Sequence, residues 1–172
     1  MLTAHSMDLE PNLKVLDLCS APGGKTTHIA ELMGNTGHIS AYDLHKNKLS
    51  LIKENLKRIG ITNTTCDVRD ATIYDSNLFE CADRVLIDVP CSGLGIIRKK
   101  PEIKWSKHIK DIKSIIDTQR QIMENASKYV KKGGVLVYST CTLNKEENEG
   151  NIEWFIESHS EFKTEPVFYG KL

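Results

Sequence analysis

Residues 14–26, KVLDLCSAPGGKT, contain the pattern that decides the fold of this chain. Residues 14–19 form a short and mostly apolar run, which is typical of a strand buried in a sheet. Gly23 and Gly24 allow unusual backbone angles and a close approach of the backbone to a ligand. Residues 26–33 then have the composition of a helix. This order of strand, glycine-containing loop and helix predicts the first unit of an α/β fold.

The same alternation continues along the rest of the chain. Apolar runs predict four more strands, at residues 37–43, 63–67, 83–89 and 135–141. Apolar positions three and four residues apart predict two more helices, at residues 46–59 and 106–130, and a last helix that carries Ile152, Phe155 and Ile156. Strands that alternate with helices form a mostly parallel, doubly wound sheet with helices on both faces.

Local signals predict where these helices begin and end. Gly60 is expected to end the helix at residues 46–59, and the pair Gly133 and Gly134 is expected to end the long helix that follows. Asn144 and Glu147 have the spacing of a capping pair for the last helix.

The composition limits the class of protein. The 172 residues suit a single domain over residues 1–172, and 23 basic residues balance 23 acidic ones, so the overall charge does not indicate a polyanionic partner. No apolar run approaches the roughly 20 residues of a membrane span, and residues 1–11 lack the features of a signal peptide. Five cysteines without a Cys-x-x-Cys pair argue against a disulfide framework and a thiolate zinc site. We expect a cytoplasmic monomer that binds neither a membrane nor a metal.

Polar, glycine-rich and cysteine-bearing segments follow the predicted strands. They are residues 19–26, Asp43, residues 67–70, residues 88–95 and Cys141. Because the carboxyl ends of parallel strands share one edge of a sheet, we expect these segments to form one ligand site.

The first of these loops resembles two phosphate-binding patterns but matches neither. A P-loop needs glycine where Cys19 stands, and the dinucleotide pattern Gly-x-Gly-x-x-Gly is absent. Asp43 has the position of an acid that holds ribose hydroxyls, although it could equally be an exposed helix-capping acid before Lys46. These features favour a nucleoside cofactor without a pyrophosphate, and S-adenosylmethionine is the common one.

Three motifs carry a resemblance to a known family. Residues 17–26, DLCSAPGGKT, resemble the cofactor motif of RNA cytosine-5 methyltransferases. Residues 88–91, DVPC, match that family's Asp-x-Pro-Cys motif, and residues 139–142, STCT, match its second-cysteine motif. Residues 95–105 further resemble the bacterial small-subunit ribosomal RNA methyltransferases of the RsmB (Sun, Fmu) type. The resemblance covers roughly residues 13–158.

The resemblance implies a Rossmann-like fold that uses S-adenosyl-L-methionine. It assigns ten residues to the cofactor pocket: Cys19, Ser20, Ala21, Pro22, Gly23, Gly24, Lys25, Asp43, Asp70 and Asp88. Asp67 is an alternative to Asp70 at the adenine end, and either could also be a solvated turn acid. The implied product is 5-methylcytosine in RNA, specifically in 16S ribosomal RNA.

The chemistry explains why two cysteines and an aspartate are needed. Carbon 5 of cytosine becomes nucleophilic only after a thiolate adds to carbon 6, and a base must later remove the proton from carbon 5. The resemblance makes Cys141 the nucleophile and Cys91 the residue that assists product release, while Asp88 binds the ring nitrogen and amino edge. A free thiol titrates near 8.5, so a nucleophilic cysteine needs a lowered pKa, and helix N-termini facing the strand ends, together with Lys25, could supply the positive potential.

Alternatives remain for both cysteines. Cys141 could be a buried strand-end residue, as most isolated cysteines are. Pro90-Cys91 has the form of the nucleophile motif of DNA cytosine-5 methyltransferases. Cys19 is expected to line the cofactor loop, and Cys66 and Cys81 are expected to be structural.

Basic residues follow the Asp-Val-Pro-Cys loop and predict an RNA contact. Residues 98–113 hold seven basic residues against two acidic ones. The RNA-binding candidates are Arg98, Lys99, Lys100, Lys104 and Trp105, the last of which could stack on an unpaired base. Lys107, Lys110 and Lys113 could instead form a solvated helix face, with Trp105 packed in the core.

Relatives of this type usually carry an N-terminal RNA-binding region and a closing C-terminal strand hairpin. We expect the first to be absent and the sheet to be truncated at the hairpin. The alternative functions are therefore a cofactor- or RNA-binding fragment with little activity of its own, or a methyltransferase that acts on tRNA or DNA.

Overall fold

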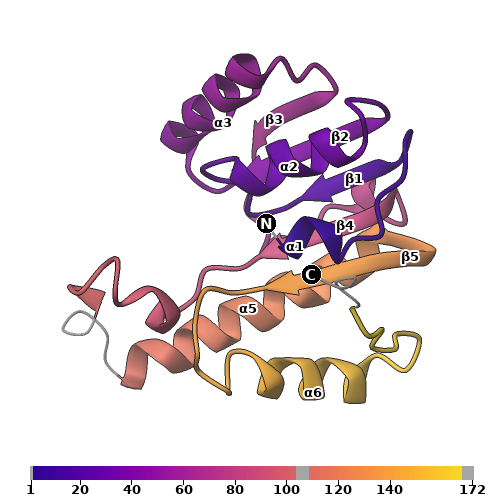
Figure 1. Ribbon diagram of the computed structural model, residues 1–172. Coiled ribbons are helices and arrows are strands. Elements are labelled where there is room, and N and C mark those ends of the chain that lie inside the picture. Colours follow the sequence, from indigo (N-terminus) through magenta and orange to yellow (C-terminus); the bar gives the residue numbers. More distant parts are fainter. Residues whose placement is uncertain (1, 104–108, 168–172) are drawn as a thin grey trace.

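The computed structural model describes residues 2–103 and 109–167. Its centre is a five-stranded sheet of β1 (Lys14–Asp17), β2 (His38–Asp43), β3 (Thr64–Val68), β4 (Ala82–Asp88) and β5 (Val130–Ser139). The strands lie in the order β3-β2-β1-β4-β5, and each pair of neighbours is parallel. The predicted α/β fold with a parallel, doubly wound sheet is confirmed (Figure 1).

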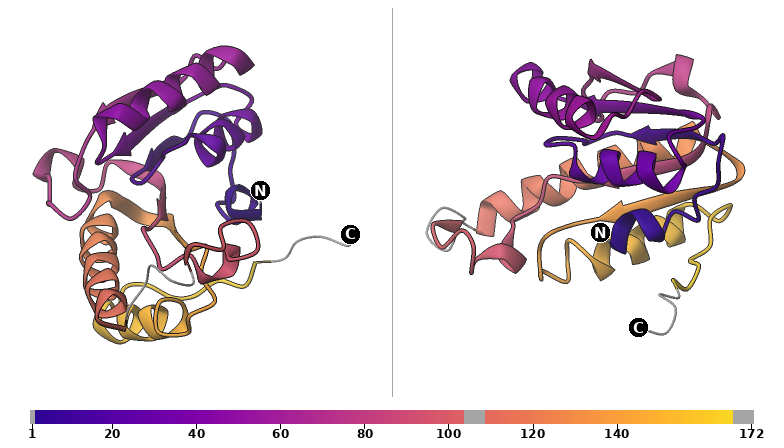
Figure 2. Two further views of the ribbon diagram at one scale, coloured as in Figure 1. Left: turned by 90° about the vertical axis from the view of Figure 1, so that its left-hand side faces the viewer. Right: turned by 45° about the horizontal axis from the view of Figure 1, so that its top comes forward.

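Helices cover both faces of the sheet. α1 (Leu2–His5), α2 (Gly24–Leu32) and α3 (Lys46–Ile59) lie on one face, and α5 (Ile109–Tyr129) and α6 (Glu149–Ser158) lie on the other. Figure 2 shows this separation from two further sides. Two short 3₁₀ turns, η1 (Ser76–Leu78) and η2 (Leu94–Ile96), interrupt the loops.

Alternating side chains of the strands supply the two cores. Val15 of β1 packs with Ile29 of α2, whereas its neighbour Leu16 packs with Ile122 and Met123 of α5. Successive side chains of a strand point to opposite faces, so a continuous apolar run is needed where both faces are covered. This requirement explains why the apolar runs in the sequence predicted the strands.

The end of the long helix differs from its prediction. α5 ends at Tyr129, and β5 begins at Val130, so Gly133 and Gly134 do not terminate the helix but lie inside the strand. A Cβ on Gly134 would lie 2.7 Å from the carbonyl oxygen of Asp83, so glycine is needed where β5 approaches β4. The predicted residues 106–108 of this helix lie outside the described residues.

The strand order places a ligand site at one edge. The chain runs from β1 outward to β3 and then returns to the other side of β1, so the loops after β1 and β4 diverge at a switch point. The arrowheads in Figure 1 all point to that edge, where the segments after β4 and β5 leave the sheet.

Two observations bear on the expectations about a membrane span and about the C-terminal strand hairpin. Within residues 2–103 and 109–167, no helix is both long and apolar enough to cross a membrane. The described residues after α6, 159–167, form no strand.

Candidate active site

The loop between β1 and α2 is anchored to the end of β2. The backbone N–H and the hydroxyl of Ser20 both donate to the carbonyl oxygen of Tyr42, each at 2.8 Å. Ala21 N–H donates to Asp43 Oδ2 at 3.1 Å. Gly23 has a φ of 100°, and a Cβ there would lie 3.1 Å from Cα of Ile52. The loop therefore has a defined shape that only glycine permits at its sharpest point.

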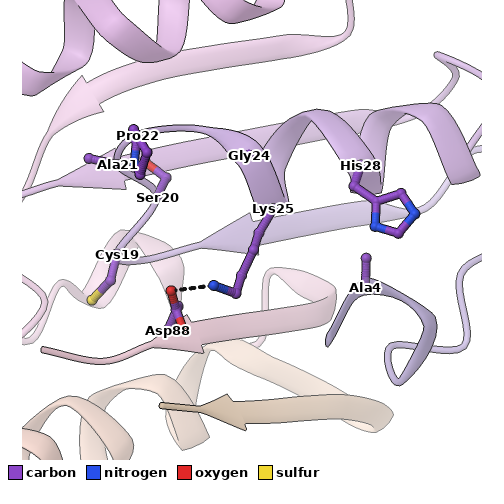
Figure 3. Close-up of a pocket in the computed structure, with 9 residues that line it drawn as sticks. All are labelled: Ala4, Cys19, Ser20, Ala21, Pro22, Gly24, Lys25, His28 and Asp88. Carbon is purple, nitrogen blue, oxygen red and sulfur yellow. Dashed lines mark hydrogen bonds and ion pairs between the residues drawn. The ribbon is translucent and has the colours of Figure 1, made fainter. Parts of the chain in front are cut away.

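This loop borders a pocket of about 300 Å³ (Figure 3). Its lining residues are Ala4, Cys19, Ser20, Ala21, Pro22, Gly24, Lys25, His28 and Asp88. Lys25, in the first turn of α2, reaches Asp88 at the end of β4, with Nζ 2.5 Å from Oδ2. The other oxygen of Asp88 accepts a hydrogen bond of 2.5 Å from the Ser139 hydroxyl.

The pocket fits the chemistry of S-adenosylmethionine. Its volume is at the lower end of the roughly 300–1,000 Å³ of small-molecule sites. Lys25 and Asp88 are the charged partners that the carboxylate and ammonium groups of an amino acid require. The motifs did not identify Ala4 and His28 as lining residues, because Ala4 of α1 reaches the pocket only through tertiary packing and His28 lies in α2 beyond the loop motif.

Asp43 and Asp70 do not line this pocket. Asp43 is 7% exposed and accepts backbone N–H groups from Ala21 and His45, at 3.1 and 3.0 Å. Asp70 accepts hydrogen bonds from the backbone N–H and hydroxyl of Thr72, at 2.9 and 2.6 Å. It borders a second pocket of about 330 Å³, whereas Asp67 is an exposed residue of the edge strand β3. The cofactor roles of Asp43 and Asp70 stay predictions.

The two cysteines lie together beyond Asp88. The sulfur atoms of Cys91 and Cys141 are 3.1 Å apart, and the backbone N–H of Cys141 donates to Cys91 Sγ at 3.3 Å. Cys141 is exposed and Cys91 is partly buried, and both are free thiols. One ligand bound against these sulfurs could contact both of them.

The thiol of Cys141 is less acidic than expected. Loss of solvent around its sulfur raises the pKa of Cys141 to about 11, and the hydrogen bond and charge of Cys91 and the charge of Asp88 act in the same direction. Lys25 opposes them but has the smallest effect. The lowered pKa that a nucleophilic thiol needs is therefore absent from the protein by itself. Burial also raises the pKa of three other thiols, Cys19, Cys66 and Cys81.

A buried polar network connects the loops that carry the cysteines. Glu147 accepts hydrogen bonds from the backbone N–H of Ser92 at 2.8 Å, from its hydroxyl at 2.5 Å, and from Gln119 Nε2 at 3.0 Å. The predicted capping pair of Asn144 and Glu147 is wrong, because α6 has Asn148 as its N-cap.

Sequence reasoning missed this network. Gln119 could have been found, since it is a polar residue on the apolar face of α5 between Ile116 and Met123. Glu147 offers no such signal, because it stands in a run of polar residues.

The RNA-binding candidates divide into two groups. Arg98, Lys99 and Lys100 are exposed and follow η2, on the loop that begins at Cys91. Lys104 and Trp105 lie outside the described residues. Within the part of the chain that the structure describes, no group of three or more His, Cys, Asp or Glu residues is arranged to hold a metal.

Known proteins similar to this chain share its family. The family model of the 16S rRNA methyltransferase RsmB/F matches residues 4–170. The "Probable ribosomal RNA small subunit methyltransferase B" of Bacillus subtilis is 44% identical over 167 residues, which are 95% of this chain and 37% of that protein. The tRNA (cytosine(72)-C(5))-methyltransferase of Pyrococcus horikoshii is 39% identical over 99% of this chain and 43% of its own length.

A solved structure agrees with these sequence matches. The crystal structure of NSun6 from Pyrococcus horikoshii with SFG superimposes with a TM-score of 0.81 and 40% identity, and the match covers 91% of this chain and 40% of that one. This chain thus spans less than half the length of these relatives. The match over nearly all of its residues nevertheless shows that the chain belongs to the RsmB/F family of 16S rRNA methyltransferases.

Proposed function

We propose that this chain transfers a methyl group from S-adenosylmethionine to carbon 5 of a cytosine in 16S ribosomal RNA, through a covalent bond between Cys141 and carbon 6. The observation that carries the proposal is the pair of sulfurs 3.1 Å apart beside Asp88, whose ion pair with Lys25 lines a pocket of cofactor size. The proposal includes a single catalytic domain over residues 1–172.

S-adenosylmethionine supplies an electrophilic methyl group. Lys25 and Asp88 would bind its amino-acid part, because they are the charged groups in the pocket. The loop of residues 19–25 would enclose it, Asp43 would hold its ribose and Asp70 would contact its adenine end. Asp88 would also bind the ring nitrogen and amino edge of the cytosine, since it lines the pocket and its charge acts on the thiol of Cys141.

The thiolate of Cys141 forms a bond to carbon 6, and the displaced electron pair makes carbon 5 nucleophilic. After the methyl group joins carbon 5, a base removes the proton there, the bond between sulfur and carbon 6 breaks, and the ring regains its double bond. Cys91 lies 3.1 Å from the departing sulfur and would assist this release. Because burial raises the pKa of Cys141 to about 11, its proton must pass to a base or to solvent as the substrate binds.

Trapping of the covalent intermediate tests the division of labour. We expect Cys141→Ala to form no protein–RNA adduct and Cys91→Ala to accumulate one, measured by denaturing electrophoresis with labelled RNA. Adduct in Cys141→Ala and none in Cys91→Ala would reverse the two roles.

Methyl transfer from labelled S-adenosylmethionine tests the substrate. Unmodified small-subunit ribosomal RNA should acquire 5-methylcytosine, mapped by sequencing after bisulfite treatment. A parallel reaction with tRNA is justified because one relative is named for cytosine 72 of tRNA. Label in tRNA or DNA alone would overturn the ribosomal substrate, and cofactor binding without transfer to any nucleic acid would favour a binding fragment.

A further inference from the structure

We propose that Glu147 is a positioning residue whose buried carboxylate sets the distance between the sulfurs of Cys91 and Cys141. The inference rests on the proposed function in one respect, namely that these cysteines are the reacting pair. The two cysteines follow different strands and are 50 residues apart in the sequence, so something other than the local chain must hold their sulfurs together.

Glu147 holds the Cys91 loop on both sides of the cysteine. Ser92, directly after Cys91, donates its backbone N–H to Oε2 and its hydroxyl to Oε1. Gln119 donates to Glu147 and, at 2.9 Å, to the carbonyl oxygen of Pro90, directly before Cys91. Both neighbours of Cys91 are thus tied to the same pair of buried side chains.

The Cys141 loop is tied to the same point. The hydroxyl of Thr142, directly after Cys141, lies 2.7 Å from the hydroxyl of Ser92 and 3.5 Å from Glu147 Oε1. Asn148, the next residue after Glu147, donates to the carbonyl oxygen of Thr142 at 3.1 Å. The carboxylate therefore stands at the junction of the two loops.

The groups around Glu147 match the two acceptor oxygens of a carboxylate. Glu147 and Gln119 are each 0% exposed, and a buried carboxylate is costly unless its oxygens are matched by donors. Here both oxygens accept, and each accepts from Ser92. Glutamine has the same shape but no charge and one acceptor oxygen, so Glu147→Gln would replace charge-assisted hydrogen bonds from Ser92 and Gln119 by weaker neutral ones and loosen the two loops.

Glu147 has no access to substrate or cofactor. It is fully buried and does not line the pocket at Lys25 and Asp88. Any effect of its substitution on the reaction must therefore act through the loops that it joins.

Crosslinking of the two sulfurs tests the inference without RNA or cofactor. Dibromobimane becomes fluorescent after two thiols have each displaced a bromide, and it bridges thiols that lie close together. We expect fluorescence from the unaltered protein and a rate about tenfold lower in Glu147→Gln at the same pH, because weaker hydrogen bonds hold the two loops together less firmly. The Cys91→Ser variant measures the background from the four cysteines that remain.

Controls separate positioning from a general loss of structure. Glu146→Gln makes the same chemical change at the exposed neighbouring residue and should crosslink at the unaltered rate. Ser92→Ala is the milder second variant, because it removes the hydroxyl bonds and keeps the N–H bond to Glu147. It should slow crosslinking in the same direction by a smaller factor, with S-adenosylmethionine affinity unchanged.

The outcomes are distinct from those of the proposed function. Crosslinking of Glu147→Gln and Ser92→Ala at the unaltered rate would overturn the inference, even in an active enzyme. Slower crosslinking in both, in a chain that transfers no methyl group, would support the inference and count against the proposed function. In an active enzyme, Glu147→Gln should lower kcat and leave KM for S-adenosylmethionine unchanged.

Discussion

At the scale of single residues, Cys141 combines exposure with a high pKa. The residue is exposed, but its sulfur lies 3.1 Å from that of Cys91. Loss of solvent around the sulfur raises the pKa of Cys141 most, and Cys91 and Asp88 raise it further. The thiol is therefore protected from chance reaction until a substrate changes its surroundings.

Alkylation of Cys141 should depend steeply on pH. A raised pKa keeps the thiol neutral, and a shift from 9.0 to about 11 leaves about 100-fold less thiolate at pH 8. The rate of labelling by iodoacetamide, followed by mass spectrometry, should rise about tenfold per pH unit from pH 7 to 10 without a plateau. Cys91→Ala should lower the pKa and speed labelling at pH 8. A plateau below pH 9 in the unaltered protein would contradict this prediction.

Asp17 is a second residue with an unusual pKa. It is fully buried; Oδ2 accepts a hydrogen bond from the Thr26 hydroxyl at 2.7 Å, and Oδ1 has no partner among the described residues. Burial raises the pKa of Asp17 from 3.8 to about 7. Between these values the folded state binds more protons than the unfolded state, so this group stabilises the fold below pH 4 and that stabilisation is lost as the pH rises through 7.

Asp17→Asn should remove this dependence. We expect the variant to be more stable than the unaltered protein at pH 8, by an amount on the order of a few kcal/mol, and to show a smaller loss of stability between pH 4 and 7. Urea denaturation at each pH provides the measurement. Asp67 is exposed, so Asp67→Asn serves as the matched control and should change neither the stability at pH 8 nor its dependence on pH. Equal pH dependence in Asp17→Asn and the unaltered protein would show that Asp17 ionises normally.

At the scale of elements, the loops after β4 and β5 are joined by backbone as well as by side chains. The N–H of Gly95, in η2, donates to the carbonyl oxygen of Cys141 at 3.0 Å. A Cβ on Gly95 would lie 2.7 Å from that same oxygen. The contact between the two loops therefore depends on the absence of a Cβ at Gly95.

Gly95→Ala should push the two loops apart. We expect a loss of about 1–3 kcal/mol in stability, typical of an overpacked site, and a slower formation of the Cys141 adduct with unchanged cofactor affinity. Gly150→Ala is the control, because Gly150 lies in α6 and a Cβ there would lie at an ordinary contact distance of 3.5 Å from the carbonyl oxygen of Lys145. It should be neutral or stabilising, as Gly to Ala is in helices. Adduct formation at an unaltered rate in Gly95→Ala would show that the loops can relax around the new methyl group.

At the scale of the whole molecule, the pocket lies where the chain reverses the direction of strand addition. Lys25 follows β1 and Asp88 ends β4, which is the pair of strands at the switch point. The sheet thereby brings together residues 63 apart in sequence.

Lys25 should contribute to cofactor affinity through this arrangement. We expect Lys25→Met to weaken S-adenosylmethionine binding about 10- to 100-fold, because a hydrogen bond to a charged group is lost. The cofactor should raise the Tm of the unaltered protein more than that of the variant, by mass action. Calorimetric titration measures the Kd, with Lys57→Met, exposed on α3, as the control. Equal affinities in the two variants would place the amino-acid part of the cofactor elsewhere.

Much of the fold could be predicted because its signals are local. The bounds of α3 followed from apolar spacing and from Gly60, whose φ of 77° ends the helix in the left-handed region. The end of α5 could not be predicted, because Gly133 and Gly134 carry the same local signal but serve a bulged contact with β4.

The sequence alone determined the α/β alternation, the family, and the candidate residues Asp88, Cys91 and Cys141, because each depends on short motifs. Only the tertiary structure decided the ion pair of Lys25 with Asp88 and the contact of the two sulfurs. It also decided that the side chain of Glu147 is buried and accepts a hydrogen bond from Ser92, which is 55 residues away in the sequence. These features depend on burial and on contacts between distant segments, which no local pattern of residues encodes.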